Sequence, residues 1–408
     1  MRVRWVGRPA VVAGMVALLA AGCQVGQSPP APATEIEIKI ASAFPMTTVD
    51  SGGRDAAEAV RIAVARHRLV GKKFPLAYVP YDDSLAGSPN EVVGIQNAEK
   101  MVKDNQILGV VGPYTSTVAT AEIPILSQAN LVAISPSTTR DCLTVPSPTC
   151  PTGFQPPAGS SFFRISPRDS LQGTAMADFA YRSLKATRVA ILLDEGSYAQ
   201  QLTDKFKREW VALGGTVVIS ASYAAKSSDF AAFLREAHDG GAQAVYVSTS
   251  EYQNHTFCAA RAQMKSIFSP TDAYFLVDDS LFDKDCLSLA GDNLTDHIIS
   301  TYAEAPGSSL KGYTGHITEY TLEAYDCALI LVDAIERAIF GNQGAIPTRA
   351  DVLRAVAATK AYKGVTGTYT FNANGDLTAP VISLYQVKKD EKDPWKFLTS
   401  IAVDGQAA

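Results

Sequence analysis

The stretch from Ile107 to Arg140 constrains the fold most, because it holds two short apolar runs that each end in hydroxyl-bearing residues. The first run is Ile107–Val111 and the second is Leu131–Ile134. An alanine-rich segment with apolar residues at helical spacing, Ala119–Ala129, separates them. This order predicts strand, loop, helix, strand and loop, with the two strands parallel and adjacent.

The two hydroxyl clusters are candidates for a binding site. In open α/β sheets, ligands bind at the carboxyl ends of the strands, and the N–H groups at a helix start attract anions. We therefore expect a small anionic group such as a carboxylate to lie near Tyr114, Ser116, Thr117, Ser137 and Thr139. Helix capping is the alternative role for such hydroxyls.

The N-terminus has the pattern of a bacterial export signal. Three arginines precede an apolar run that is too short to span a membrane, and the run ends at Gly22-Cys23. Residues 18–23, LLAAGC, resemble a lipobox, although Ala20 replaces the usual leucine. We predict a lipoprotein signal peptide over residues 1–22, lipidation of Cys23 and a proline-rich tether over residues 23–34. Secretion with a free cysteine is the alternative.

Composition and motifs exclude several functions. The chain has 408 residues, 47% of them hydrophobic, which is enough for two domains. Its net charge of −5 argues against a nucleic-acid partner. The sequence contains no CxxC, HExxH, GxSxG or GxGxxG motif, so we expect no metal site, no cofactor and no enzymatic activity.

Five cysteines follow the predicted lipidation site. Cys142 and Cys150 flank a proline-rich loop and are predicted to form a disulfide, which would stabilise the fold by roughly 2–3 kcal/mol. Cys258 and Cys286 are the second predicted pair. Cys327 lies in an apolar helical run and is predicted to be a buried thiol.

The remaining chain alternates strand and helix patterns in two series, divided near residue 166, which predicts two doubly wound α/β lobes. After residue 303 the pattern changes to a long helix, Glu319–Phe340. A hairpin between Gly367–Phe371 and Val381–Val387 is expected around an Asn-Ala-Asn-Gly turn. A final strand is expected near Trp395–Ile401.

These segments together resemble the type I solute-binding proteins of ABC transporters, specifically the leucine/isoleucine/valine-binding group. The resemblance is carried by VVGPYTSTVATAEIPILSQANLVAISPSTT, RVAILLDEGSYAQQLTDKFKREW and the FNANGDL turn before ISLYQV. It implies the type I periplasmic binding protein fold, in which two Rossmann-like lobes are joined by a three-segment hinge. Lobe 1 would comprise residues 35–165 with 303–366, and lobe 2 residues 166–302 with 367–403.

The resemblance also implies roles for residues of the first lobe. Ser116 would donate to the carboxylate of an amino-acid ligand, and the backbone carbonyl of Ser137 would accept from its ammonium group. Thr139 would contact both ends of the ligand backbone.

In the second lobe, Tyr198 would cover the ligand and Asp279 would pair with its ammonium group, although a shift of register could bring Asp278 there instead. Ser250 stands where branched-chain amino-acid binders often carry Tyr, and Thr48 where the first loop often offers an aromatic residue. The resemblance therefore implies an amino acid or related compound as ligand, and a polar or larger amino acid fits as well as a branched one.

The function that the resemblance implies is capture of a small ligand and its delivery to an ABC permease and its ATPase. The protein would be a monomer outside the cytoplasm, with the lipid anchor as its only contact with the membrane. A ligand-sensing receptor module of the same fold that feeds a signalling partner is the alternative.

Overall fold

The computed structural model describes most of the chain: residues 36–48, 51–146, 154, 156–195, 197–224, 227, 229–249, 256–269, 272–279, 297–302, 310, 313–318, 320–387 and 395–403. The predicted signal peptide and tether lie outside these residues, with Cys23. Contacts group Ile36–Ala408 into one compact unit. Within the described ranges, no helix is both long and apolar enough to cross a bilayer.

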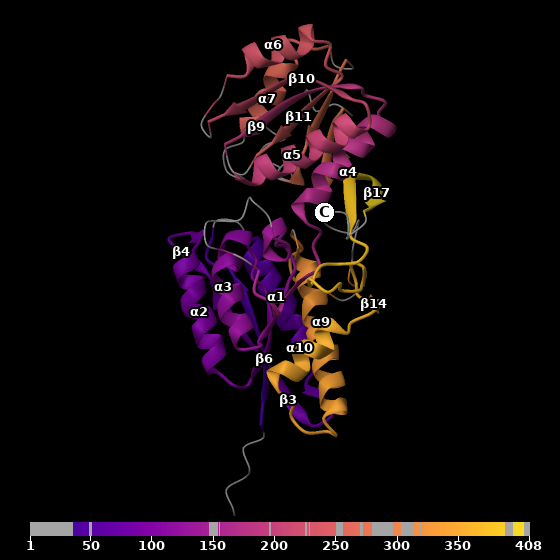
Figure 1. Cartoon of the computed structure of the whole chain (residues 1–408). Coiled ribbons are helices and arrows are strands. Elements are labelled where there is room, and N and C mark those ends of the chain that lie inside the picture. The colour runs from indigo at the N-terminus through magenta and orange to yellow at the C-terminus, as the bar shows by residue number, and fades with distance from the viewer. Residues whose placement is uncertain are drawn as a thin grey trace, which may run out of the picture. The chain divides into compact units, whose positions relative to one another are not determined.

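The first sheet has six strands in the order β2-β3-β1-β6-β7-β8. Figure 1 labels two of them, β3 and β6. They are β1 Ile38–Phe44, β2 Leu69–Val70, β3 Phe74–Asp82, β6 Ile107–Val111, β7 Val132–Ser135 and β8 Phe162–Arg164. All neighbours are parallel except β2 and β3. The predicted parallel pair β6 and β7 is confirmed, and the strand order changes direction at β1, which lies between β3 and β6.

Alternation along β1 sends its side chains into two cores on opposite faces of the sheet. The helices around this sheet are α1 Gly52–Arg66, α2 Glu91–Lys103, α3 Ser116–Gln128, α9 Thr321–Gly341 and α10 Arg349–Ala357. On one face, Ile38, Ile40 and Phe44 pack with α1 and α9, whereas on the other face Ala41 and Ala43 pack with α2 and α3.

The second sheet has seven strands in the order β10-β9-β11-β12-β13-β16-β17. They are β9 Arg188–Asp194, β10 Thr216–Tyr223, β11 Ala244–Ser248, β12 Tyr274–Val277, β13 Ile298–Tyr302, β16 Val381–Val387 and β17 Trp395–Ala402. Its helices are α4 Asp169–Arg182, α5 Ser197–Ala212, α6 Ala231–Asp239 and α7 Thr256–Met264. Alternating residues of β9 again serve two cores, one containing α4 and α5 and the other α6 and α7.

The hairpin predicted between Gly367–Phe371 and Val381–Val387 is wrong. Thr368–Tyr369 (β15) pairs with Tyr362–Lys363 (β14), while β16 lies antiparallel between β13 and β17. The Asn-Gly turn instead closes on itself, because the Asn372 N–H donates to the Asp376 carbonyl at 2.8 Å. The final predicted strand, near Trp395–Ile401, is present as β17.

The segment around this turn packs with the first sheet. Tyr369, Phe371 and Leu377 are buried in the same core as β1 and α9. These three residues therefore belong to the core of the first sheet. The short hairpin of β4 Ser84–Leu85 and β5 Ser88–Pro89 and the 3-10 helix Asp141–Leu143 complete the elements.

Candidate functional site

The two hydroxyl clusters meet at the carboxyl edge of the first sheet. β6 leads into α3, whose N-cap is Thr115 and whose first residue is Ser116. The Ser116 hydroxyl accepts from the backbone N–H groups of Thr139 and Arg140, each at 3.3 Å. The start of α3 is therefore joined directly to the loop that follows β7, as the pattern of apolar runs and hydroxyls predicts.

A second set of hydrogen bonds holds the loop after β7 in place. The buried Ser135 hydroxyl donates to the Pro113 carbonyl at 2.7 Å and accepts from the Thr138 N–H at 3.0 Å. The Ser137 hydroxyl donates to the Tyr114 carbonyl at 2.7 Å. The side chains of Ser135 and Ser137 thus build the site, which leaves the Ser137 carbonyl as its candidate ligand group.

Thr117 differs from the other predicted hydroxyl residues. It is exposed in the first turn of α3, and its carbonyl accepts from the Thr120 hydroxyl at 2.7 Å. No described contact ties its side chain to the loop after β7. The fold does bring other predicted residues together, because hydrogen bonds join Ser116 to Thr139 and Ser137 to Tyr114.

Aromatic rings connect this edge to Asp279. Tyr114 packs edge-on against Phe44 and Tyr320, with ring centroids 5.7 and 6.2 Å apart, and Tyr320 stacks on Tyr302 at 5.7 Å. The Tyr320 hydroxyl donates to Asp279 Oδ2 at 3.4 Å. Sequence reasoning missed Tyr302 and Tyr320, because neither lies in a hydroxyl-rich or glycine-rich strand end.

The structure separates the roles of the two neighbouring aspartates after β12. The fully buried Asp278 carboxylate accepts from the Ser248 hydroxyl at 2.8 Å and the Thr249 N–H at 3.1 Å, so it ties two strand ends together. Asp279 instead faces the Tyr320 hydroxyl. This geometry favours Asp279 over Asp278 as the acidic ligand contact.

Asp169, the first residue of α4, is a third acidic residue at the site that the sequence did not reveal. Its N–H donates to the Thr139 carbonyl at 2.8 Å, and its side chain is only 3% exposed. Burial, helped by repulsion from Asp141 and Asp279, raises the pKa of Asp169 to about 8, while the Thr139 hydroxyl and the Arg164 guanidinium oppose the rise. In the sequence, this residue looks like an ordinary acidic helix start.

Some predicted residues lie outside the described part of the chain. Ser250, Cys150 and Cys286 are among them, as are the side chains of Tyr198 and Cys258. Their contact and disulfide assignments stay predictions, although Tyr198 is placed in the first turn of α5.

The other two cysteines of the fold are described. Cys142 is buried in the 3-10 helix. Cys327 is a buried free thiol in α9, as predicted, and burial holds its pKa well above the usual value. The described residues contain no group of three or more His, Cys, Asp or Glu that could hold a metal ion.

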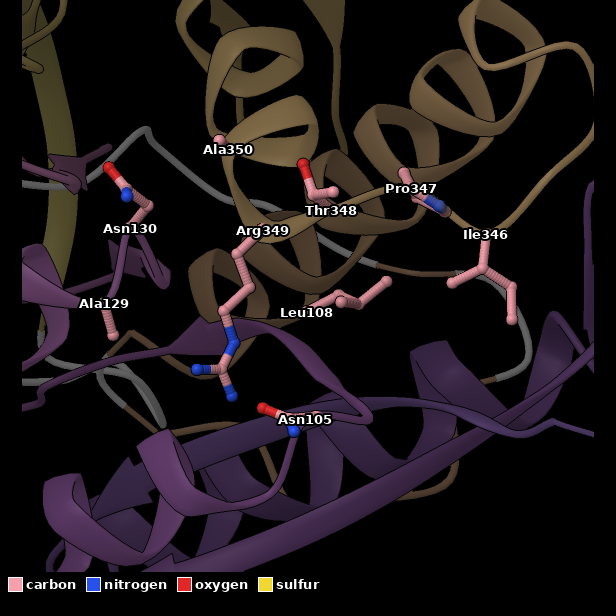
Figure 2. A pocket seen from close by; sticks show the side chains of 9 residues that line it. All are labelled: Asn105, Leu108, Ala129, Asn130, Ile346, Pro347, Thr348, Arg349 and Ala350. Atoms are coloured by element: carbon pink, nitrogen blue, oxygen red, sulfur yellow. The ribbon is translucent and has the colours of Figure 1, made fainter.

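A cavity of about 370 Å³ lies elsewhere, beside the amino end of β6 and the start of α10 (Figure 2). Arg349 reaches into it toward Asn105, but its guanidinium already donates to the backbone carbonyls at the end of α2 and the start of β6, over 2.7–3.1 Å. Arg349 is therefore engaged in holding α10 against the first sheet, which makes the cavity a weak candidate for an anion site.

The chain is similar to known proteins over most of its length. The family described as "Periplasmic binding protein" matches residues 37–392. The Leu/Ile/Val-binding protein homolog 3 of Brucella melitensis biotype 1 is 26% identical over 345 residues, which are 83% of this chain and 86% of that protein.

Two solved structures show the same fold. The leucine binding protein LivK of Thermotoga maritima has a TM-score of 0.69 at 23% identity, covering 89% of this chain and 98% of its own. A solute binding protein of an ABC transporter from Rhodopseudomonas palustris, in complex with p-hydroxybenzoic acid, has a TM-score of 0.70 at 19% identity, covering 90% and 98%. The predicted fold class is thereby confirmed.

Proposed function

The chain belongs to the periplasmic binding protein family, and from this premise we propose that it is an extracytoplasmic solute-binding protein of an ABC importer. It captures an amino acid or a related amine-bearing carboxylate between its two lobes and presents it to a permease. Delivery rather than signalling fits the proposed lipid anchor at Cys23. Replacing Cys23 with Ala is expected to move the protein from the membrane fraction to the soluble fraction of its host, as followed by immunoblot.

One observation supports the choice of ligand class: hydrogen-bond donors that suit an anion and acidic residues that suit a cation are linked through Thr139. Ser116 and the start of α3 offer donors to a carboxylate, as helix N-termini do. Thr139 receives its hydrogen bond from Asp169 on one side and gives one to Ser116 on the other. Asp279 offers a carboxylate to an ammonium group, and Asp169 offers a second one once its carboxyl, with a pKa of about 8, has lost its proton. A zwitterionic ligand, which carries both a carboxylate and an ammonium group, matches both kinds of binding group.

The solved relatives suggest one alternative ligand class, an aromatic carboxylate like the p-hydroxybenzoic acid bound by the Rhodopseudomonas palustris protein. Such a ligand carries no cation to face the carboxyl groups of Asp169 and Asp279. We therefore prefer an amine-bearing ligand.

A thermal-shift screen of the mature chain, starting after Cys23, tests this proposal. The panel contains the common amino acids, their amides and p-hydroxybenzoate. A ligand at 100 times its dissociation constant adds about 2.7 kcal/mol to the free energy of unfolding, which gives a clear rise in melting temperature. Stabilisation by p-hydroxybenzoate but by no amine-bearing solute would contradict the proposed ligand class.

Ser116→Ala is expected to weaken ligand binding by about 10- to 100-fold, because a charge-assisted hydrogen bond contributes roughly 1.5–3 kcal/mol. Isothermal titration calorimetry with the ligand found in the screen measures the change. Thr120→Ala is the matched control, since it removes one hydroxyl from the same helix, and that hydroxyl donates to the Thr117 carbonyl within the helix. Equal affinities of the two variants would show that the Ser116 hydroxyl does not contribute to ligand binding.

A further inference from the structure

Two carboxyl groups lie together beneath the helices α2 and α3, which cover one face of the first sheet, away from the hydroxyl clusters. Asp83 follows β3 and is 1% exposed, and Glu122 lies in the middle of α3 and is fully buried. No described N–H or O–H group donates to Asp83 Oδ2 or to either Glu122 oxygen. Two ionised carboxylates are acceptors only, so these oxygens cannot satisfy one another unless one of them carries a proton.

The surroundings of the pair offer little compensation for two negative charges. Asn97 of α2 donates to Asp83 Oδ1 at 2.9 Å, and Lys100 reaches the Asn97 amide oxygen at 3.4 Å rather than the pair. Asp82, the last residue of β3 and the neighbour of Asp83, adds a like charge. Two carboxyls in one buried site lose their protons in separate steps, with one pKa strongly raised.

The packing brings α2 and α3 close together at the pair. At Gly94 of α2, a Cβ atom would lie 2.6 Å from Val118 Cγ1 and 3.0 Å from Glu122 Oε1. The glycine therefore allows α2 to lie directly on the Glu122 carboxyl. Burial raises the pKa of Glu122 well above its usual range and that of Asp83 to about 6.

We propose that Asp83 and Glu122 share one proton near neutral pH and form a pH-sensitive contact between the β3–α2 loop and α3. The end of β3, just before this loop, also supports the β1–α1 connection, because Asp82 Oδ1 accepts from the Met46 N–H at 2.8 Å. In acid the shared proton makes the contact a hydrogen bond between carboxyl groups. Loss of that proton to solvent leaves two buried negative charges and weakens the contact.

The direction of the pH effect follows from proton binding. In the unfolded chain both carboxyls ionise near pH 4, whereas the folded pair retains a proton to higher pH. The folded state therefore binds more protons above pH 4, so this pair stabilises the fold most in acid and its contribution is lost as the pH rises past the raised pKa.

Glu122→Gln tests the proposal, because the amide has the shape of the protonated acid and cannot ionise. We expect its melting temperature to exceed that of the unaltered protein by about 3 °C or more at pH 8, and by less than about 1 °C at pH 5. Glu99→Gln is the control on α2, where Glu99 is exposed, and its difference from the unaltered protein should not change between the two pH values. Parallel pH profiles of the unaltered protein and Glu122→Gln would overturn the proposal.

A spectroscopic measurement keeps the test independent of how well the variant folds. Infrared spectra of the unaltered protein at pH 7 should contain the carbonyl stretch of protonated carboxyls, to which Asp169 also contributes. The part of that band that comes from the pair should be lost in Asp83→Asn or Glu122→Gln and kept in Asp169→Asn. An unaltered protein with no protonated-carboxyl band that depends on these residues would also contradict the shared proton.

Discussion

Arg164→Met is expected to lower the free energy of unfolding by about 3–5 kcal/mol, because it leaves the buried Asp376 carboxylate without its main cation. Arg164 is fully buried, and its Nε donates to Asp376 Oδ1 at 2.7 Å. Its Nη2 donates to the Thr144 hydroxyl at 2.6 Å, and Nη1 to the Arg140 carbonyl at 2.8 Å. Denaturant unfolding followed by circular dichroism measures the loss.

This arginine is so important because it connects three segments that are distant in sequence. Arg164 itself lies at the end of β8. Its partners Arg140 and Thr144 lie on the loop after β7, which also carries the hydroxyl cluster. Its third partner, Asp376, lies in the turn before β16. Removing the cation therefore costs the ion pair and frees both the turn and the loop.

An exposed pair provides the control for this prediction. Arg182 and Asp178 form an i, i+4 ion pair on α4, with the arginine side chain 62% exposed. Arg182→Met should change stability by no more than about 0.5 kcal/mol. A loss below about 1 kcal/mol for Arg164→Met would mean that the segments are held by other contacts. In the double variant with Asp376→Asn, part of the stability should return, because the Asp376 side chain no longer carries a buried charge. The return should be incomplete, because the buried Arg168, whose Nε lies 3.7 Å from Asp376 Oδ2, loses the same carboxylate.

The two-sheet architecture could be predicted because its strands are short apolar runs bounded by turn residues. The β6–α3–β7 unit is the best example: the hydroxyls that end its runs are also those that join the two loops. At the turn near Asn374, the prediction from local turn residues is wrong. Its Asn-Gly signal predicts a hairpin, but the local bonds from Asn372 to Asp376 close the turn early, and the next strand pairs with β13, distant in sequence.

The sequence could predict residues of the candidate site only where those residues also follow the end of a predicted strand. Ser116 and Thr139 follow strand ends, so periodicity locates them. Tyr320 reaches Asp279 through tertiary structure alone, from a left-handed backbone position (φ 56°) before α9, and no sequence period marks it. Asp169 and Glu122 look like ordinary residues of amphipathic helices. Their unusual burial depends on which helices pack on them, which spacing in the sequence does not encode.

The affinity for an amine-bearing ligand is expected to rise by about 50-fold between pH 6 and pH 8, because the Asp169 carboxyl must ionise to face an ammonium group. With a pKa of about 8, this carboxyl is almost fully protonated at pH 6 and half ionised at pH 8. Each ligand bound near pH 7 should then release close to one proton to solvent. Titration calorimetry in two buffers with different ionisation enthalpies measures this proton count.

Asp169→Asn should remove this pH dependence, since the amide has the shape of the protonated acid and cannot ionise. At pH 8 the variant should bind at least about 10-fold more weakly, as expected for the loss of one charge-assisted contact. Asp178→Asn, on the exposed face of the same helix, is the control and should retain the pH profile. A pH-independent affinity of the unaltered protein would show that Asp169 stays neutral when ligand binds. Asp279 would then be the ammonium partner without Asp169, while the proposed ligand class would remain in place.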